Sequence, residues 1–155
     1  MVSRKSFRKH PRWREGEAGS AAIEFGLLAP FLVLLAVGTA EIGSSVYEAM
    51  QAQNAAEAGA VYASKYGFDT AGIVNSVENA TGGASITAVP APATFCGCPT
   101  ASGVTAMSCA ATCAEGSAPG QYLRISAQIT HNPSTSLPGL VMPGTITGQA
   151  IVRMY

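Results

Sequence analysis

The chain has few of the residues from which most enzyme active sites are built. Charged side chains make up 12% of its 155 residues, and it has only two histidines. His10 lies in a basic N-terminal stretch and His131 at the end of a predicted strand, where a lone histidine is usually a surface residue. No nucleophile-elbow serine or phosphate-binding loop occurs, and the carboxylates after residue 66 are scattered. We therefore predict no catalytic residue, no cofactor and no enzymatic activity.

Cysteine is absent outside one short segment, which reads CGC, ten residues, C, three residues, C. A tetrahedral zinc site usually takes its thiolates from C-x-x-C pairs, so this spacing argues against a metal site. An even, clustered set of cysteines instead favours disulfides and an oxidising compartment. Cys96 and Cys98 form an awkward, strained pair, so each should bond to Cys109 or Cys113, in an order that the sequence leaves open.

The net charge of zero hides an asymmetry along the chain. Residues 1–18 carry six Arg or Lys and two Glu, a net charge of +4, whereas residues 20–155 carry three cations and seven carboxylates, a net charge of −4. A basic leader before an apolar run follows the positive-inside rule, so we expect this leader to be unstructured and cytoplasmic. The alternative is a tail that binds nucleic acid. It is disfavoured because no second basic patch supports it, and we predict no nucleic-acid partner.

The apolar run that follows is a candidate membrane anchor. Phe25–Ala40 contains 16 residues without a charge, which cover about 24 Å of a hydrocarbon core about 30 Å thick. The flanking apolar residues extend the predicted span to about residues 23–44. The run is long for a secretory signal and no A-x-A site with a polar sequel follows it, so it should stay in the protein, in contact with lipid. Pro30 should kink the helix or weaken one hydrogen bond, which a membrane helix can tolerate. Glu41 should mark the outer edge of the membrane.

From Ser20 to Tyr66 the chain lacks any strong helix breaker except Pro30, so we predict one helix over residues 20–66, about 70 Å long. Its second half is rich in small residues at four-residue spacing. These residues would let another backbone approach closely, or they would simply face solvent. The two rows are Ala52, Ala56, Ala60 and Ala55, Gly59, Ala63. Gly67 should end the helix, and Asp69 or Thr70 should cap a short helix over Ala71–Ala80.

The remainder predicts a small antiparallel sheet of about three strands. Tyr122–Thr130 and Ile146–Tyr155 alternate apolar and polar residues, and Ala84–Val89 does so weakly. Two long loops are predicted from segments rich in Pro, Gly and Ser, namely Pro90–Gly120 and His131–Thr145. Disulfides of the four cysteines should cross-link the first loop. The predicted fold class is α+β, with the outer half of the long helix packed on the sheet.

A short motif stands where the basic leader meets the apolar helix: Gly19-Ser20-Ala21-Ala22-Ile23-Glu24-Phe25. A carboxylate at the start of an apolar helix has a high free-energy cost in a membrane unless it is paired with a cation. Glycine gives a flexible backbone that a protease could hold extended. Cleavage after Gly19 would create an amino group on Ser20, four residues before Glu24, and that cation could neutralise Glu24 of its own or a neighbouring helix.

This motif resembles the processing site of type IV pilin-like precursors, in which Glu24 would be the fifth and Phe25 the sixth mature residue. Residues 19–66, with a proline inside the apolar run, a second glutamate after it and an alanine-rich extension, resemble the TadE-like family of tight-adherence pilus systems. The closing segment ITGQAIVRMY also resembles the family's last strand. The segment Pro90–Gly120 carries no match to the family's pattern.

The resemblance implies a minor pseudopilin that is cut by a prepilin peptidase and acts in the biogenesis of adhesive pili. Its implied partners are other pseudopilins, Flp-type pilin and the inner-membrane assembly machinery. We expect a cytoplasmic leader at residues 1–19, the helix at 20–66 and a periplasmic head at 67–155, in a bacterial inner membrane or an extracellular pilus. The rival interpretations are an uncleaved, membrane-anchored binding domain and a membrane-tethered enzyme.

Overall fold

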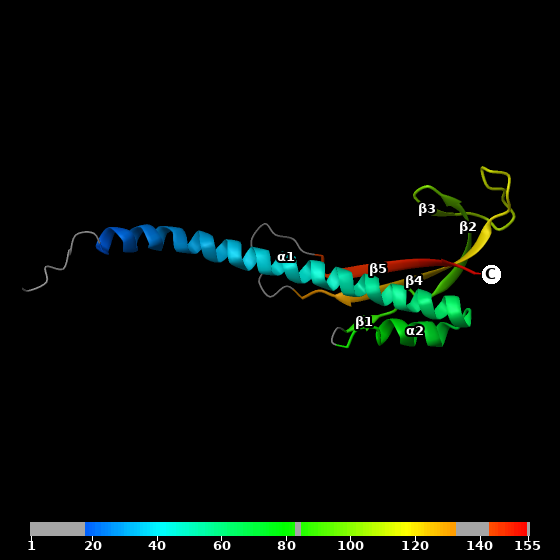
Figure 1. Ribbon diagram of the computed structural model, residues 1–155, viewed down its shortest axis with the longest axis horizontal. Helices are drawn as coiled ribbons and strands as arrows, with labels where there is room; N and C mark the ends of the chain where they lie inside the picture. The colour runs from blue at the N-terminus through cyan, green and yellow to red at the C-terminus, as the bar shows by residue number, and fades with distance from the viewer. Residues whose placement is uncertain (1–17, 83–84, 133–142, 155) are drawn as a thin grey trace, which may run out of the picture. The chain divides into compact units, whose positions relative to one another are not determined.

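The computed structural model describes residues 18–82, 85–132 and 143–154 (Figure 1). It contains a long helix α1 (Ala18–Tyr66), a short helix α2 (Thr70–Glu78) and five strands. The strands are β1 (Ile86–Thr87), β2 (Ala93–Thr100), β3 (Gly103–Ala106), β4 (Gly120–Thr130) and β5 (Thr145–Arg153). The predicted α+β class, with its long N-terminal helix and antiparallel sheet, is confirmed. The leader before Ala18 and most of the segment between β4 and β5 lie outside the described residues.

The chain divides into two compact units, residues 1–40 and 41–155, and the second holds α2, the sheet and the last turns of α1. β4 is the central strand of the antiparallel sheet. Along one edge it pairs with β5 from Tyr122↔Arg153 to Thr130↔Thr145. Its other edge pairs with β2 near its start and with β1 near its end, and β3 pairs only with β2 (Figure 1).

The sheet has five strands where the sequence predicted about three. The two extra strands, β2 and β3, form a hairpin inside the segment predicted as the long loop Pro90–Gly120. Gly97 and Pro99 interrupt the β-forming pattern of β2, so local propensity favours a loop there. The hydrogen bonds that override this propensity come from pairing with β4, a partner more than twenty residues away.

The core of the second unit lies between the helices and one face of the sheet. Alternate residues of β4 face the helices and are buried, as the predicted alternation of this strand requires: Leu123, Ile125, Ala127 and Ile129. α2 contributes Ile73 and Val77, and α1 contributes the fully buried Ala52, Ala55 and Ala56 together with Ala63. The small-residue face of α1 therefore packs on the sheet of its own head, so it is not exposed to solvent.

Two glycines make this close packing possible. A Cβ at Gly148 of β5 would collide with the backbone of Ala52 in α1, and a Cβ at Gly59 would lie 2.7 Å from Cγ2 of Val77. Gln53 reinforces the same contact: its Nε2 donates to the carbonyl of Gln149 at 3.1 Å, and its Oε1 accepts from the Gln149 amide at 3.2 Å. The helix thus satisfies the outward-facing backbone groups of the edge strand at this point.

The end of α1 is fixed by backbone geometry and by one side-chain hydrogen bond. Gly67 has φ +82°, and its amide donates to the carbonyl of Ala63 at 2.9 Å, which is the left-handed cap predicted for it. Asp69 occupies the N-cap position of α2 without a side-chain capping bond and instead accepts from the Tyr62 hydroxyl at 3.1 Å. This hydrogen bond raises the pKa of Tyr62 above its ordinary 10.0. Its stabilising contribution is complete below pH 10 and is lost as the pH rises through the higher folded-state pKa.

Replacing Gly148 with alanine tests the close contact between β5 and α1. The added methyl has no room beside Ala52, so we expect Gly148→Ala to lower the free energy of unfolding by about 1–3 kcal/mol. Gly144→Ala is the matched control, because a Cβ there has no neighbour within 4 Å. The measurement is thermal unfolding of the detergent-solubilised chain by near-ultraviolet circular dichroism. Equal stability of the two variants would contradict the packing.

Candidate functional site

The processing motif predicted from the sequence lies in the first turns of α1. Gly19, Ser20, Glu24 and Phe25 are all exposed, and a Cβ at Gly19 would meet no neighbour within 4 Å. Because residues four apart share a helix face, the Ser20 hydroxyl lies 3.4 Å from Glu24 Oε1 and donates to it. The helical spacing therefore places the backbone nitrogen of Ser20 and the carboxylate of Glu24 within one turn of each other.

The part of α1 that follows exposes large apolar side chains along its length. The exposed fraction is 67% for Ile23 and is above half for the others: Phe25, Leu27, Leu28, Phe31, Leu32, Val33, Leu34 and Leu35. Among the described residues, α1 is the one helix long and apolar enough to cross a membrane. A soluble protein rarely leaves so large an apolar surface in water, so this segment suggests a membrane anchor.

Two polar residues of the second unit are buried. Glu41, predicted to mark the outer edge of the membrane, is only 6% exposed. His131 is 3% exposed, and its Nδ1 lies 2.6 Å from Oε2 of Glu48 in α1. The expectation that His131 is a surface residue is wrong. Glu48 and His131 are 83 residues apart, so no local pattern could have revealed this link between α1 and the end of β4.

Both predicted disulfides are present, and the structure settles their order. Cys96 bonds to Cys109 and Cys98 to Cys113, with Cα–Cα distances of 5.1 and 5.7 Å. Residues two apart in a strand share a face, so both bonds hold the following loop against one side of β2. Cross-linking loops of this size restricts the unfolded chain and contributes about 3 kcal/mol for each bond.

The glycine between Cys96 and Cys98 has a structural reason. A Cβ at Gly97 would point to the opposite face of β2, where it would lie 2.6 Å from Cγ1 of Val104 and 2.8 Å from the carbonyl oxygen of Thr105. The C-G-C sequence therefore places two cystines on one face of the strand and leaves room on the other face for the side chain of Val104 from the paired strand β3.

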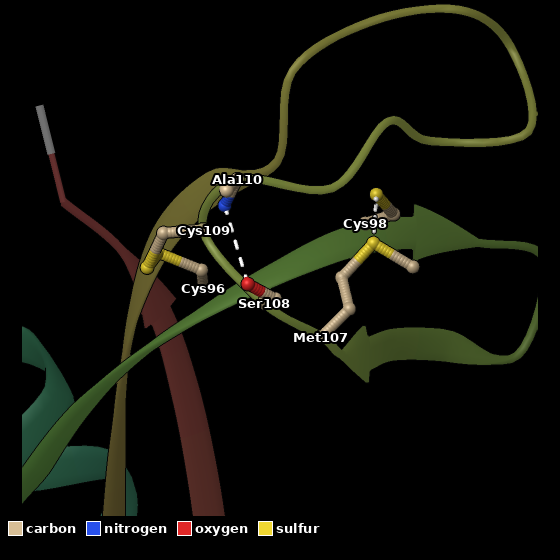
Figure 2. The surroundings of a disulfide bond; sticks show 6 residues. All are labelled: Cys96, Cys98, Met107, Ser108, Cys109 and Ala110. Atoms are coloured by element: carbon tan, nitrogen blue, oxygen red, sulfur yellow. Dashed lines mark hydrogen bonds between the residues drawn. A yellow bond between two sulfur atoms is a disulfide. The ribbon is translucent and has the colours of Figure 1, made fainter.

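The loop after β3 is held mainly by sulfur and backbone contacts (Figure 2). The Met107 amide donates to the carbonyl of Cys96 at 2.9 Å, and its Sδ lies 3.1 Å from Cys98 Sγ. Since Cys98 has no thiol hydrogen, the latter is a sulfur–sulfur contact. The Ser108 hydroxyl accepts from the Ala110 amide at 3.4 Å. Residues 90–119 contribute nothing to the main apolar cluster of the head, so the disulfides substitute for a core here.

The fold and these features define the class of molecule: an α+β head built on the second half of a helix whose first half is a candidate membrane anchor. Residues 19–61 match the family of TadE-like proteins, which confirms the resemblance over this segment. The match begins at the glycine of the processing motif and ends within α1. No curated protein and no solved structure shows a significant similarity to the chain.

Removing cysteines in pairs tests the disulfide order. The variant Cys96→Ser/Cys109→Ser should keep one native bond and show no free thiol, and it should lose about 3 kcal/mol of local stability. The mismatched variant Cys96→Ser/Cys113→Ser leaves Cys98 and Cys109 without their native partners, and we expect free thiols and faster proteolysis of residues 107–119. The measurement is thiol titration with limited proteolysis. Identical behaviour of the two variants would refute the assigned order.

Proposed function

We propose that this protein is a minor pseudopilin, or pilus-assembly component, of a tight-adherence system. The observation that carries the proposal is the match of residues 19–61 to TadE-like proteins, which starts at the predicted cleavage site. The family associates the chain with the pilus components of such systems. The proposed role is one of assembly, in which the chain is the substrate of a prepilin peptidase.

In the proposed topology, the chain crosses a bacterial inner membrane once. The net positive leader stays in the cytoplasm, the apolar part of α1 spans the bilayer, and the head lies in the periplasm. The two disulfides support this placement, because disulfides persist in oxidising compartments such as the periplasm. The proposed domain limits are a leader at 1–19, a helix at 20–66 and a head at 67–155.

Processing would convert the motif into a charge pair. Cleavage after Gly19 frees the amino group of Ser20, which becomes a cation one helical turn from Glu24. A single buried carboxylate is costly in a bilayer, and an adjacent ammonium group reduces that cost. The amine can neutralise Glu24 of the same helix or of a neighbouring helix. In the second case the pair sets the register between subunits.

The size of the head supports a minor role over that of a bulk filament subunit. About 90 residues follow the helix, which is far more than the head of a major Flp-type pilin. The proposed partners are the prepilin peptidase, other pseudopilins, Flp-type pilin, the inner-membrane assembly machinery and membrane lipid. The alternative is an uncleaved, single-pass anchor for an extracytoplasmic binding domain, in which Glu24 only reaches toward the interface.

The mature N-terminus distinguishes these functions. We expect the chain extracted from membranes of cells that contain the peptidase to begin at Ser20. The variant Gly19→Leu should retain its leader, because a bulky residue cannot replace the flexible glycine at the scissile bond. Gly26→Leu is the matched control on the same helix, since a Cβ at Gly26 also meets no neighbour, and it should be cut normally. The measurement is intact mass. A native chain that keeps Met1 would support the uncleaved anchor.

The role of Glu24 is tested by removing its charge and verifying that the variant chain is still cleaved. In Glu24→Ala the amine of Ser20 loses its partner, and a lone charge in the bilayer costs about 2.5–3.5 kcal/mol, so we expect pili to fall at least about tenfold. Glu24→Asp keeps the charge and should retain more pili. The measurement is a pilus count, with cleavage and membrane insertion checked in parallel. An unchanged count in Glu24→Ala would exclude the register role.

A further inference from the structure

The sheet of the head has two faces of different character. One face packs against α1 and α2. The other, which we call the open face, carries the remaining alternate side chains of β4 and β5, of which Tyr122 and Ser126 are buried. Arg124 and Thr147 on this face are exposed, and Ile151 is 41% exposed although it is apolar. The exposed side chains of the open face are thus available for contact with another molecule.

Aromatic, apolar and cationic groups gather at one end of the open face. The ring of Phe95 lies 5.9 Å from the ring of Tyr122, and the guanidinium of Arg124 lies over Phe95 at 4.8 Å. Ile151 stands directly opposite Arg124 in the sheet register, and Arg153 stands opposite Tyr122. We call these five residues the arginine–aromatic patch. Arginine and aromatic side chains are the types that dominate binding energy at protein interfaces.

The helix layer has the opposite charge. The exposed carboxylates there are Glu57, Asp69 and Glu78, and Lys65 is the single basic residue in the sequence between residues 20 and 123. On the open face, no residue of the described strands is acidic. On the described strands the open face therefore carries only basic charges, whereas the exposed charges of the helix layer are mainly acidic.

We propose that the arginine–aromatic patch of one copy docks on the acidic helical face of a second copy of this chain. A front-to-back contact of this kind brings opposite charges together. A symmetric contact between two sheet faces would instead oppose arginine to arginine. A front-to-back contact is heterologous and can propagate to a third copy.

The patch does not rely on ion pairs alone. An exposed ion pair contributes at most about 1 kcal/mol, so Phe95 and Ile151 must supply apolar area to the contact. Confinement of the copies to one membrane raises their effective concentration, so a contact that is weak in solution can be populated. Asp69 accepts a hydrogen bond from the Tyr62 hydroxyl, and Glu57 accepts one from Gln53 Nε2 at 3.1 Å. A carboxylate can accept further hydrogen bonds, so the proposed acidic partners are Glu57 and Glu78 on the two helices.

The experiment places the photo-crosslinking amino acid p-benzoylphenylalanine at position 151 of the full chain in native membranes. We expect an adduct of twice the chain mass, whose crosslinked peptide from the second copy lies within residues 41–80. Arg124→Glu should reduce the adduct about fivefold or more, and Arg124→Lys should reduce it less. The triple variant Arg124→Glu/Glu57→Arg/Glu78→Arg should restore it, because the charges are exchanged. Unchanged thermal unfolding of each variant confirms that the head is folded.

Several results would overturn this proposal: no adduct of twice the chain mass, an adduct only with a different protein or with lipid, or a crosslink to the sheet face of the second copy. An adduct that is indifferent to charge reversal would do the same. The contact lies in the head and does not require cleavage. The adduct is therefore expected in Gly19→Leu as well, so failure of the contact and failure of the processing proposal are distinguished.

Discussion

The head depends on the close approach of α1 to the edge of its sheet. Side chains larger than alanine would hold the helix away from β4 and β5, and at Gly148 even a methyl group meets the backbone of Ala52. Burial of Ala52, Ala55 and Ala56 brings the helix near enough for Gln53 to bond both backbone groups of Gln149. Small residues thus give α1 a face that is specific for this sheet, although alanine offers little apolar area for each contact.

This constraint divides a single helix between two environments. Before Glu41 the large apolar side chains are exposed, which suits lipid. After Glu41 one face of the helix is part of the head's own core, with α2 and β4 packed around it. The cystine hairpin is independent of this core, because backbone pairing to β4 and two disulfides hold it.

Features with a local or periodic signal could be predicted from the sequence. The long helix, the alternation of β4 and β5, the left-handed cap at Gly67 and the presence of disulfides all belong to this group. The hairpin of β2 and β3 could not, because Gly97 and Pro99 weaken its local signal and its stability comes from distant pairing. The order of the disulfides and the Glu48–His131 contact depend on tertiary geometry alone. At the predicted processing motif, the sequence is as informative as the structure, because the proposed charge pair would form only after the chain is cut.

The central claim is that the second half of α1 belongs to the folded head while its first half belongs to the membrane. Native-state hydrogen exchange on the chain in lipid nanodiscs tests this most directly. The account predicts that amides of residues 52–63 open in one cooperative step with those of β4, at the same free energy. It also predicts that amides of residues 25–40 stay protected when denaturant unfolds the head. The contrary result is that the amides of residues 52–63 open together with those of residues 25–40 and independently of β4. The whole of α1 would then unfold as a unit separate from the head, and the account of this head would be wrong.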